Sequence, residues 1–126
     1  MDATVKSDQL STHQEIVDCV AHYIESAVTG KSGPMRSVMH PDAQIVGYLD
    51  GELMDGPMQI LYDYVDESEP AGDKLSWAVT SVEESNGAAT ARVVINDWHG
   101  YYFNDFFTLV KHEGKWTIIN KVFSQT

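Results

Sequence analysis

The sequence predicts an α+β domain in which three N-terminal helices pack on a mainly antiparallel sheet. In residues 11–30 and 57–67 the apolar residues recur at helical spacing, whereas from Lys74 onward they alternate with a period of two, as strands do. Three two-residue loops with glycine second favour tight hairpins between the strands, namely Asn86-Gly87, His99-Gly100 and Glu113-Gly114. Helices followed by hairpin-linked strands indicate the α+β class.

The composition limits the classes of protein that this chain can be. With 126 residues, 43% of them hydrophobic, the chain suits one domain over residues 11–126 after a flexible lead-in over residues 1–10. The formal charge of −11, with neither Lys nor Arg between Ser37 and Asp73, disfavours nucleic acids and anionic membranes as partners. A single cysteine, Cys19, and no apolar leader favour a cytoplasmic protein.

The first helix is predicted by its start signal and its apolar stripe. Ser11 and Gln14 have the spacing of a capping box. Apolar residues follow at helical spacing, namely Ile16, Val20, Tyr23 and Ala27. Gly30 can adopt the left-handed conformation that often ends a helix. We therefore expect a helix of about 18 residues, the longest in the chain, lying across the sheet.

Three shorter elements are expected between this helix and the strands. Pro34 can open a short helix that runs to Met39. Asp50-Gly51 predicts a small hairpin between residues 44–49 and 52–54. Asp55-Gly56-Pro57 then predicts the start of a third helix, whose stripe is Met58, Leu61 and Val65.

The hairpin loops also predict which side chains share a sheet face, because loop length sets the register. If every loop has two residues, the helix-side face carries Asp97, Tyr102, Asn104, Phe106 and Lys121. The opposite face then carries a large apolar set, namely Trp77, Trp98, Phe107, Trp116 and Ile118. Since a monomer rarely exposes such a patch, we expect a homodimer through this outer face.

Polar side chains on the helix-side face predict a small-molecule site. Asp97, Tyr102, Asn104 and Lys121 would lie beside Tyr23, and Tyr48 and Tyr62 are further candidates. A buried Lys121 would require an anionic ligand group or a carboxylate partner. The alternative is that Lys121 reaches the rim of the sheet and keeps its ammonium in water.

The candidates for catalysis each have a structural alternative. Asp97 could orient His99 as an acid–base pair, although His99 suits a solvent-facing hairpin turn better. His40 could line the mouth as a general base or end a helix before Pro41. Asp105 is expected on the opposite face, near Asn120 and Arg92, in a structural ion pair or an interface contact and not in catalysis. No metal-ligand spacing and no phosphate-binding loop is present, so neither metal nor cofactor is expected.

Three stretches of the sequence resemble a known superfamily. They are Met39-His40-Pro41-Asp42-Ala43, Gly47-Tyr48 before Asp50-Gly51-Glu52-Leu53, and Asp105–Lys111 before Gly114–Phe123. With the element order, they resemble the nuclear transport factor 2-like superfamily, in its SnoaL-like, putative lumazine-binding branch. The resemblance implies a cystatin-like α+β cone in which a curved sheet wraps the first helix. It also implies a hydrophobic ring compound as ligand, such as a pteridine or lumazine.

The resemblance leaves binding and catalysis open, because the superfamily hosts both. In its ketosteroid isomerase branch a tyrosine on the first helix works with two carboxylates in the cone. Tyr23 matches that tyrosine, but the carboxylate positions fall at Gly47 and Phe106. We therefore expect a small-molecule-binding cone. The alternatives are a lyase, isomerase or hydrolase that uses Asp97, Tyr23 and His40, and a structural dimer with a filled cone.

Overall fold

A computed structural model of the chain describes residues 3–126, with side chains from Gln9 onward. Three α-helices, a 3-10 turn at Gly72–Lys74 and six strands form this part of the chain. The helices are α1 (Ala3–Thr29), α2 (Gly33–Arg36) and α3 (Gln59–Glu67). The strands are β1 (Met39–Leu49), β2 (Glu52–Pro57), β3 (Ser76–Ser85), β4 (Ala88–Trp98), β5 (Tyr101–His112) and β6 (Lys115–Gln125).

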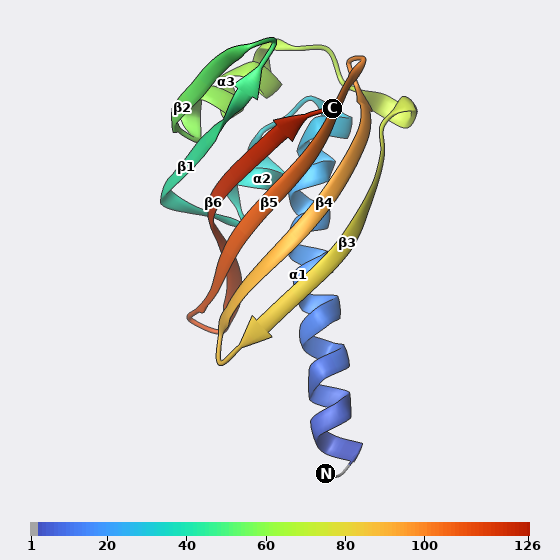
Figure 1. Ribbon diagram of the computed structural model, residues 1–126, viewed down its shortest axis with the longest axis vertical. Helices are drawn as coiled ribbons and strands as arrows, with labels where there is room; N and C mark the ends of the chain where they lie inside the picture. Colours follow the sequence, from blue (N-terminus) through green and yellow to red (C-terminus); the bar gives the residue numbers. More distant parts are fainter. Residues whose placement is uncertain (1–2) are drawn as a thin grey trace.

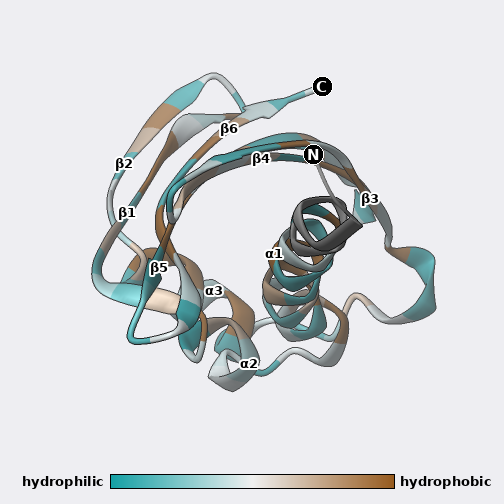
Figure 2. Cartoon of the chain, turned by 90° about the horizontal axis from the view of Figure 1, so that it is seen from below, coloured by the Kyte–Doolittle hydropathy of each residue, from teal (hydrophilic) through white to brown (hydrophobic). Residues whose placement is uncertain are grey.

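The strands form one curved sheet with the order β2-β1-β6-β5-β4-β3 (Figure 1). Neighbouring strands are antiparallel except β1 and β6, which are parallel. Seen end on, the sheet arches over α1, and α2 and α3 lie on the same concave side (Figure 2). This arrangement confirms the predicted α+β cone. No helix in residues 3–126 combines the length and the apolar character needed to cross a membrane.

The core lies between α1 and the concave face of the sheet. The predicted stripe of α1 is buried, since Ile16, Val20, Tyr23 and Ala27 are each at most 2% exposed. The helix begins at Ala3, so most of the expected lead-in is helical, and residues 1–2 of that lead-in lie outside the described part. The short second helix spans Gly33–Arg36 and ends earlier than expected, because Met39 already begins β1.

The four two-residue hairpin loops form as predicted. In each loop both residues have positive φ, between 49° and 85°, from Asp50-Gly51 to Glu113-Gly114. This is the conformation of a type I′ turn, whose twist matches that of the flanking strands.

The predicted sheet faces are wrong along β5, because β4 contains a bulge. Ile95 pairs with Phe103 and Trp98 with Tyr101, so two residues of β4 oppose a single residue of β5. Asp97, with φ of 59°, lies in this bulge. Since side chains alternate along a strand, one extra residue exchanges the two faces beyond it. Asp105 therefore points into the core.

Two further bulges have the same effect. In β3 the register shifts between Val79 and Ser81, and in β6 Ile119 is the extra residue between the partners of Thr108 and Leu109. The β6 bulge lets Ile118 and Lys121, three residues apart, both point to the concave side, where they are 0% and 3% exposed.

The residues predicted for the dimer interface lie in the core instead. Trp98, Phe107, Trp116 and Ile118 are at most 5% exposed, and Trp77 is partly buried against the same core. The bulges turn these side chains toward the helices, so the prediction that they form a dimer interface is wrong. The convex face carries other apolar residues, which are 45–50% exposed: Tyr102, Phe106 and Val122.

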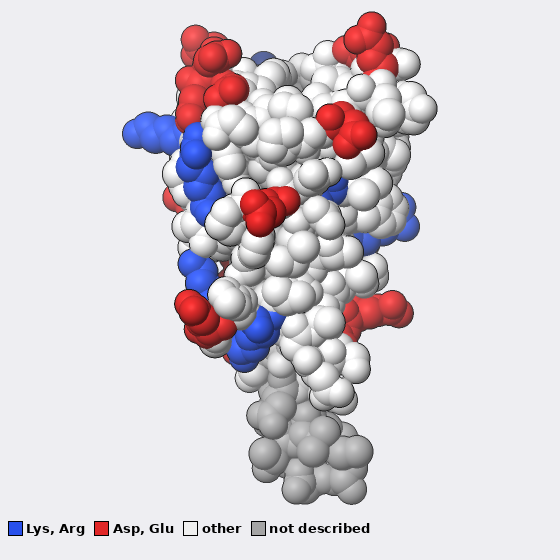
Figure 3. Space-filling view, turned by 90° about the vertical axis from the view of Figure 1, so that its left-hand side faces the viewer, with Lys and Arg blue, Asp and Glu red and all other residues white. Residues whose placement is uncertain are grey.

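Charged residues are distributed unevenly over the surface. Figure 3 shows the side that lies on the left in Figure 1, where β1 and β2 run. Acidic side chains gather toward its upper end, Lys and Arg side chains follow its left-hand edge, and most of the remaining surface is uncharged. On these strands Tyr48 and Leu53 pair directly and are 62% and 55% exposed.

Candidate functional site

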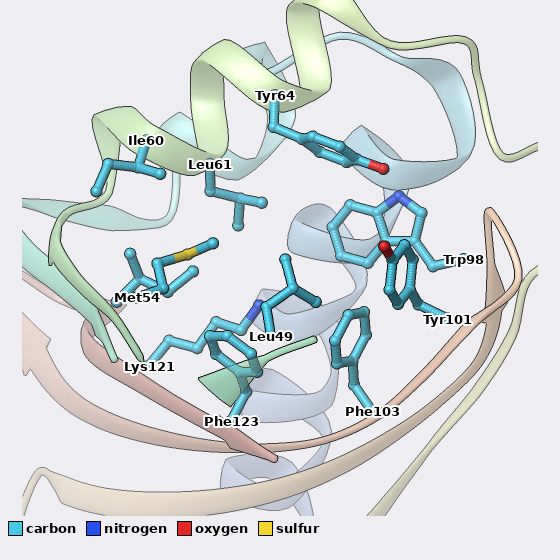
Figure 4. Close-up of a pocket in the computed structure, with 11 residues that line it drawn as sticks. Leu49, Met54, Ile60, Leu61, Tyr64, Trp98, Tyr101, Phe103, Lys121 and Phe123 are labelled. Atoms are coloured by element: carbon cyan, nitrogen blue, oxygen red, sulfur yellow. The ribbon is translucent and has the colours of Figure 1, made fainter. Parts of the chain in front are cut away.

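A cavity of about 200 Å³ lies between α3 and the concave face of the sheet (Figure 4). Aliphatic residues of β1, β2 and α3 form one wall, and the other carries the aromatic side chains Trp98, Tyr101, Phe103 and Phe123. Lys121 is the one charged residue among those that line the cavity. An apolar pocket with few polar groups is typical of a small-molecule site.

Two glycines allow the cavity walls to pack closely. A β-carbon at Gly47 would lie 2.4 Å from the carbonyl oxygen of Phe123, so no side chain fits there. The ring of Phe123 passes over Gly47 and reaches the cavity wall. A β-carbon at Gly56 would likewise lie 2.6 Å from the Cδ1 atom of Ile60, another lining residue.

Lys121 joins a buried cluster with Tyr23 and Asp105. Its Nζ atom donates a hydrogen bond of 2.5 Å to the hydroxyl of Tyr23 and lies 3.4 Å from Oδ2 of Asp105. Tyr23 and Asp105 are both 0% exposed. Nζ also lies over four aromatic rings, 5.1–5.9 Å from their centres, and one of them is the ring of Phe123. Such rings attract a cation.

Asp105 is the least satisfied group of this cluster. Neither of its carboxylate oxygens has a hydrogen-bond partner within the described residues. Burial raises the pKa of Asp105, and the positive charge of the nearby Lys121 opposes this shift without cancelling it. Burial also lowers the pKa of Lys121, against the opposing effect of Asp105. For Tyr23, burial and the negative charge of Asp105 raise the pKa. The three groups can therefore exchange a proton.

A second polar pair lies where α3 meets the β4–β5 hairpin. Nε2 of His99 lies 2.6 Å from the carbonyl oxygen of Glu69, which can only accept, so Nε2 carries a hydrogen. Nδ1 of the neutral ring then accepts a hydrogen bond of 2.7 Å from the hydroxyl of Tyr64, which lines the cavity. Tyr64 is 42% exposed, so this pair faces the open side of the cavity.

Tyr101 is the second lining tyrosine with a polar partner. Its hydroxyl donates a hydrogen bond of 2.7 Å to Oδ2 of Asp50. Gln125 donates to Oδ1 of the same carboxylate. These hydrogen bonds lower the pKa of Asp50, with that from Tyr101 acting most strongly. They tie the β1–β2 loop to the ends of β5 and β6.

Of the residues predicted to form the site, the structure brings Tyr23 and Lys121 together. Tyr48 is on the convex side and 62% exposed, and Tyr102 and Asn104 also face the convex side because of the β4 bulge. Asn104 there accepts a hydrogen bond from Arg92. The prediction that Tyr102 and Asn104 lie on the helix side is therefore wrong.

The remaining candidates lie away from the cavity wall. The guanidinium of Arg36 lies over the ring of Tyr62, with its carbon 4.2 Å from the centre of that ring. In the bulge, Oδ1 of Asp97 accepts a hydrogen bond from the amide of Gly100. Nδ1 of His40 accepts one from the amide of Asp42. In the described residues no group of three His, Cys, Asp or Glu is placed to hold a metal ion.

Sequence reasoning missed the inward position of Asp105 and the role of Tyr64 and Tyr101 in the wall. One signal could have revealed the first. Along β5, Phe103, Phe107 and Leu109 form a more apolar set than the residues that alternate with them, and Asp105 belongs to that set. The wall could not be predicted, since it is assembled from α3 and five strands.

The fold and the cavity define a class of protein, a cone-shaped α+β domain with a ligand-sized pocket between its third helix and the sheet. The chain belongs to the nuclear transport factor 2-like superfamily and, within it, to the family described as putative lumazine-binding, whose model matches residues 11–124.

Known proteins similar to this chain include an aldolase and structures of unknown function. The chain is 31% identical over 115 residues to the aldolase FrzH of Cladobotryum sp., with 90% of each chain covered. An NTF2-like protein of unknown function from Shewanella baltica is 32% identical, with a TM-score of 0.86 over 93% of this chain and 95% of the other. One from Silicibacter pomeroyi is 25% identical, with a TM-score of 0.87 over 94% and 98%.

Proposed function

We propose that this protein binds a small, largely apolar carbonyl compound with its carbonyl oxygen at Lys121, and that it acts on the adjacent carbon as an aldol-type lyase. The observation that carries the proposal is the single amine on an apolar wall, held by the buried Tyr23 and Asp105. A carbonyl oxygen that gains negative charge during reaction is stabilised most by a fixed donor in a site with little water.

Two of the polar groups that line the cavity, Lys121 and Tyr64, suit the two parts of such a reaction. Lys121 donates to the carbonyl oxygen and stabilises the enolate formed when the neighbouring carbon loses a proton. Tyr64 accepts that proton while its own hydroxyl proton passes to Nδ1 of His99, the acceptor of its hydrogen bond. The imidazolium that forms keeps its hydrogen bond to the carbonyl of Glu69. Acid–base help of this kind contributes about 10²–10⁴-fold to a rate.

The likeness to an aldolase supports this reaction class. The aldolase FrzH shares 31% of the aligned residues over nearly the whole of this chain. The proposal changes the catalytic residues expected from sequence, since Asp97 and His40 do not line the cavity. Of the three expected groups, Tyr23 stays in the proposed site.

The second candidate function is binding without reaction, which the family description favours. A flat ring with carbonyl groups, such as lumazine, would stack on Phe103 or Phe123 and accept a hydrogen bond from Lys121. The cavity itself argues against the third alternative, a cone filled with side chains.

Exchange of carbon-bound protons distinguishes these functions. Cyclohexanone in deuterated buffer should lose the signal of the protons next to its carbonyl, as followed by proton NMR. Tyr64→Phe should slow this exchange by about 100-fold or more, since it removes the relay to His99. Tyr102→Phe, a matched control on the convex face, should leave the rate unchanged. Saturation transfer without exchange would support binding alone, and the absence of both would reject the proposed site.

We also propose that the chain forms a homodimer through the convex face of the sheet. Val46, Val122 and Phe106 lie side by side on β1, β6 and β5, and Arg92 on β4 follows Phe106. Val122 and Phe106 are 50% and 46% exposed. A second copy would cover this apolar row, and the guanidinium of Arg92, 5.6 Å from the ring centre of Phe106, would lie at its edge.

A further inference from the structure

We propose that Lys121 is a nucleophile, and that it forms a covalent iminium bond with the carbonyl carbon of an aldehyde or ketone held in the cavity. This inference rests on the proposed function, because it requires a carbonyl compound in the cone. It goes further in the chemistry, since the amine would bond to the carbonyl carbon in place of donating to its oxygen, and an enamine would take the place of the enolate.

The position of the amine meets the first requirement of such a reaction. The side chain of Lys121 extends from β6 toward the middle of the cavity (Figure 4). The residue is 3% exposed, so its nitrogen is reached through the cavity and not from the outer surface. The surrounding apolar and aromatic walls would hold a small carbonyl compound against it.

The second requirement is an uncharged amine, since an ammonium has no free electron pair. Two acceptors contact Nζ, the hydroxyl of Tyr23 and Oδ2 of Asp105. Oδ1 of Asp105 has no hydrogen-bond partner within the described residues, so it can take up a proton while Oδ2 stays beside Nζ. Burial lowers the pKa of Lys121 and raises the pKa of Asp105, and both shifts reduce the free energy needed to move a proton from the ammonium to the carboxylate.

The bonds and protons balance without a further reactant. Asp105 takes a proton from the Lys121 ammonium, and the free amine attacks the carbonyl carbon to form a C–N bond. The adduct nitrogen then gives up one of its two protons, which reaches the former carbonyl oxygen by way of the Tyr23 hydroxyl, and protonated Asp105 returns its proton to the same oxygen. It leaves as water, and the remaining species is a C=N⁺ iminium. Overall, a ketone and the Lys121 ammonium give an iminium and one water. Loss of a neighbouring carbon-bound proton then gives the enamine, which attacks a second carbonyl.

The other lysines with described contacts provide internal controls. Lys111 lies 3.4 Å from a carboxylate oxygen of Glu15, and Lys115 donates a hydrogen bond to the carbonyl of Ser37. Both are exposed, and neither lines the cavity. An amine reaction that depends on the cavity should therefore modify Lys121 far faster than these two residues.

Reductive trapping with cyclohexanone and cyanoborohydride tests the inference directly. An iminium at Lys121 is reduced to a stable amine that carries one cyclohexyl group, and peptide mass spectrometry of the wild-type protein locates it. We expect Lys121 to be modified at least about tenfold faster than Lys111 or Lys115, which corresponds to about 1.4 kcal/mol in activation free energy. Because the site is mapped in the unaltered protein, the result does not depend on the folding of a variant.

Two variants refine the test. Lys121→Met should abolish the fast adduct and Lys115→Met should not, with circular dichroism confirming that both are folded. Tyr23→Phe keeps the amine and removes a proton donor, so it should slow the adduct without abolishing it. Cyclohexanone that binds and exchanges its protons without trapping at Lys121 would overturn the iminium and leave the proposed function intact. The absence of both binding and exchange would overturn the iminium and the proposed function together. Labelling of Lys121 at the same rate as the exposed lysines would overturn the iminium.

Discussion

Replacing Lys121 with methionine should destabilise the fold by an amount that depends on pH. The Lys121 ammonium lies 3.4 Å from the Asp105 carboxylate, and both are buried. At an effective dielectric constant of about 20, this distance corresponds to an attraction of about 5 kcal/mol. Methionine conserves much of the apolar volume, so the cost comes mainly from leaving Asp105 without its positive partner. Breaking a buried pair in this way costs about 3–5 kcal/mol at neutral pH.

The sign of the pH dependence follows from the pKa of Asp105. Burial raises this pKa, and in the variant no lysine opposes the shift. The folded variant therefore keeps a proton that the unfolded chain releases near pH 4, since a free aspartic acid has a pKa of about 3.9. Because the folded state binds more protons, its free energy of unfolding falls as pH rises above that value. The slope is about 1.4 kcal/mol per pH unit until the folded-state pKa is reached.

Urea unfolding at about pH 5 and about pH 8 measures this effect, with the wild type compared at both values. Lys121→Met should lose more stability relative to the wild type at the higher pH. The double variant Lys121→Met/Asp105→Leu is the matched control, because it removes both charges. It should recover most of the loss, and its pH profile should be flat in this range. If Lys121→Met lost less than about 1 kcal/mol with a profile parallel to the wild type, the charged pair would be refuted.

The remaining predictions concern the core, the thiol and the convex face. Ile16→Ala, at a fully buried site, should lower the free energy of unfolding measured in urea by about 2–4 kcal/mol. Glu25→Ala, at an exposed site of the same helix, should lower it by less than about 0.5 kcal/mol. Equal losses would contradict the assigned helix face. Burial raises the pKa of the Cys19 thiol to about 11, so a thiol reagent at about pH 8 should react only as the protein unfolds, and immediate reaction of the native protein would contradict the buried thiol. Between about pH 9 and 11 the folded state keeps this proton longer, so the wild type should lose stability relative to Cys19→Ala. Phe106→Arg should convert a wild-type dimer to monomer in sedimentation, and a monomeric wild type at micromolar concentration would disprove the proposed interface.

The local sequence alone determined the elements and their turns. The spacing of Ile16, Val20 and Tyr23 places all three on one face of a helix. In the hairpin loops, each glycine and the residue before it tolerate the positive φ that a type I′ turn requires. These features depend on neighbours within a few positions, so no tertiary information was needed. The inward position of Lys121, close to Tyr23, was also predicted from the hairpin register.

The three bulges, by contrast, were decided by the tertiary structure. Strand side chains alternate with a period of two, so one extra residue in β4 exchanges both faces of β5. Bulges bend and twist a strand, and here the sheet must curve around α1 (Figure 2). The local sequence offers a weak hint, since aspartate tolerates the φ of 59° found at Asp97.

The buried cluster shows the consequence for function. Lys121 was predicted on the correct face, yet its partner Asp105 was predicted on the wrong one, because two residues of β4 oppose one of β5. The cavity is likewise assembled from α3 and from strands that are distant in sequence. The sequence by itself determined which residues build the cone. How the strands bend around the helix, and so which carboxylate meets the buried amine, depended on packing the whole sheet at once.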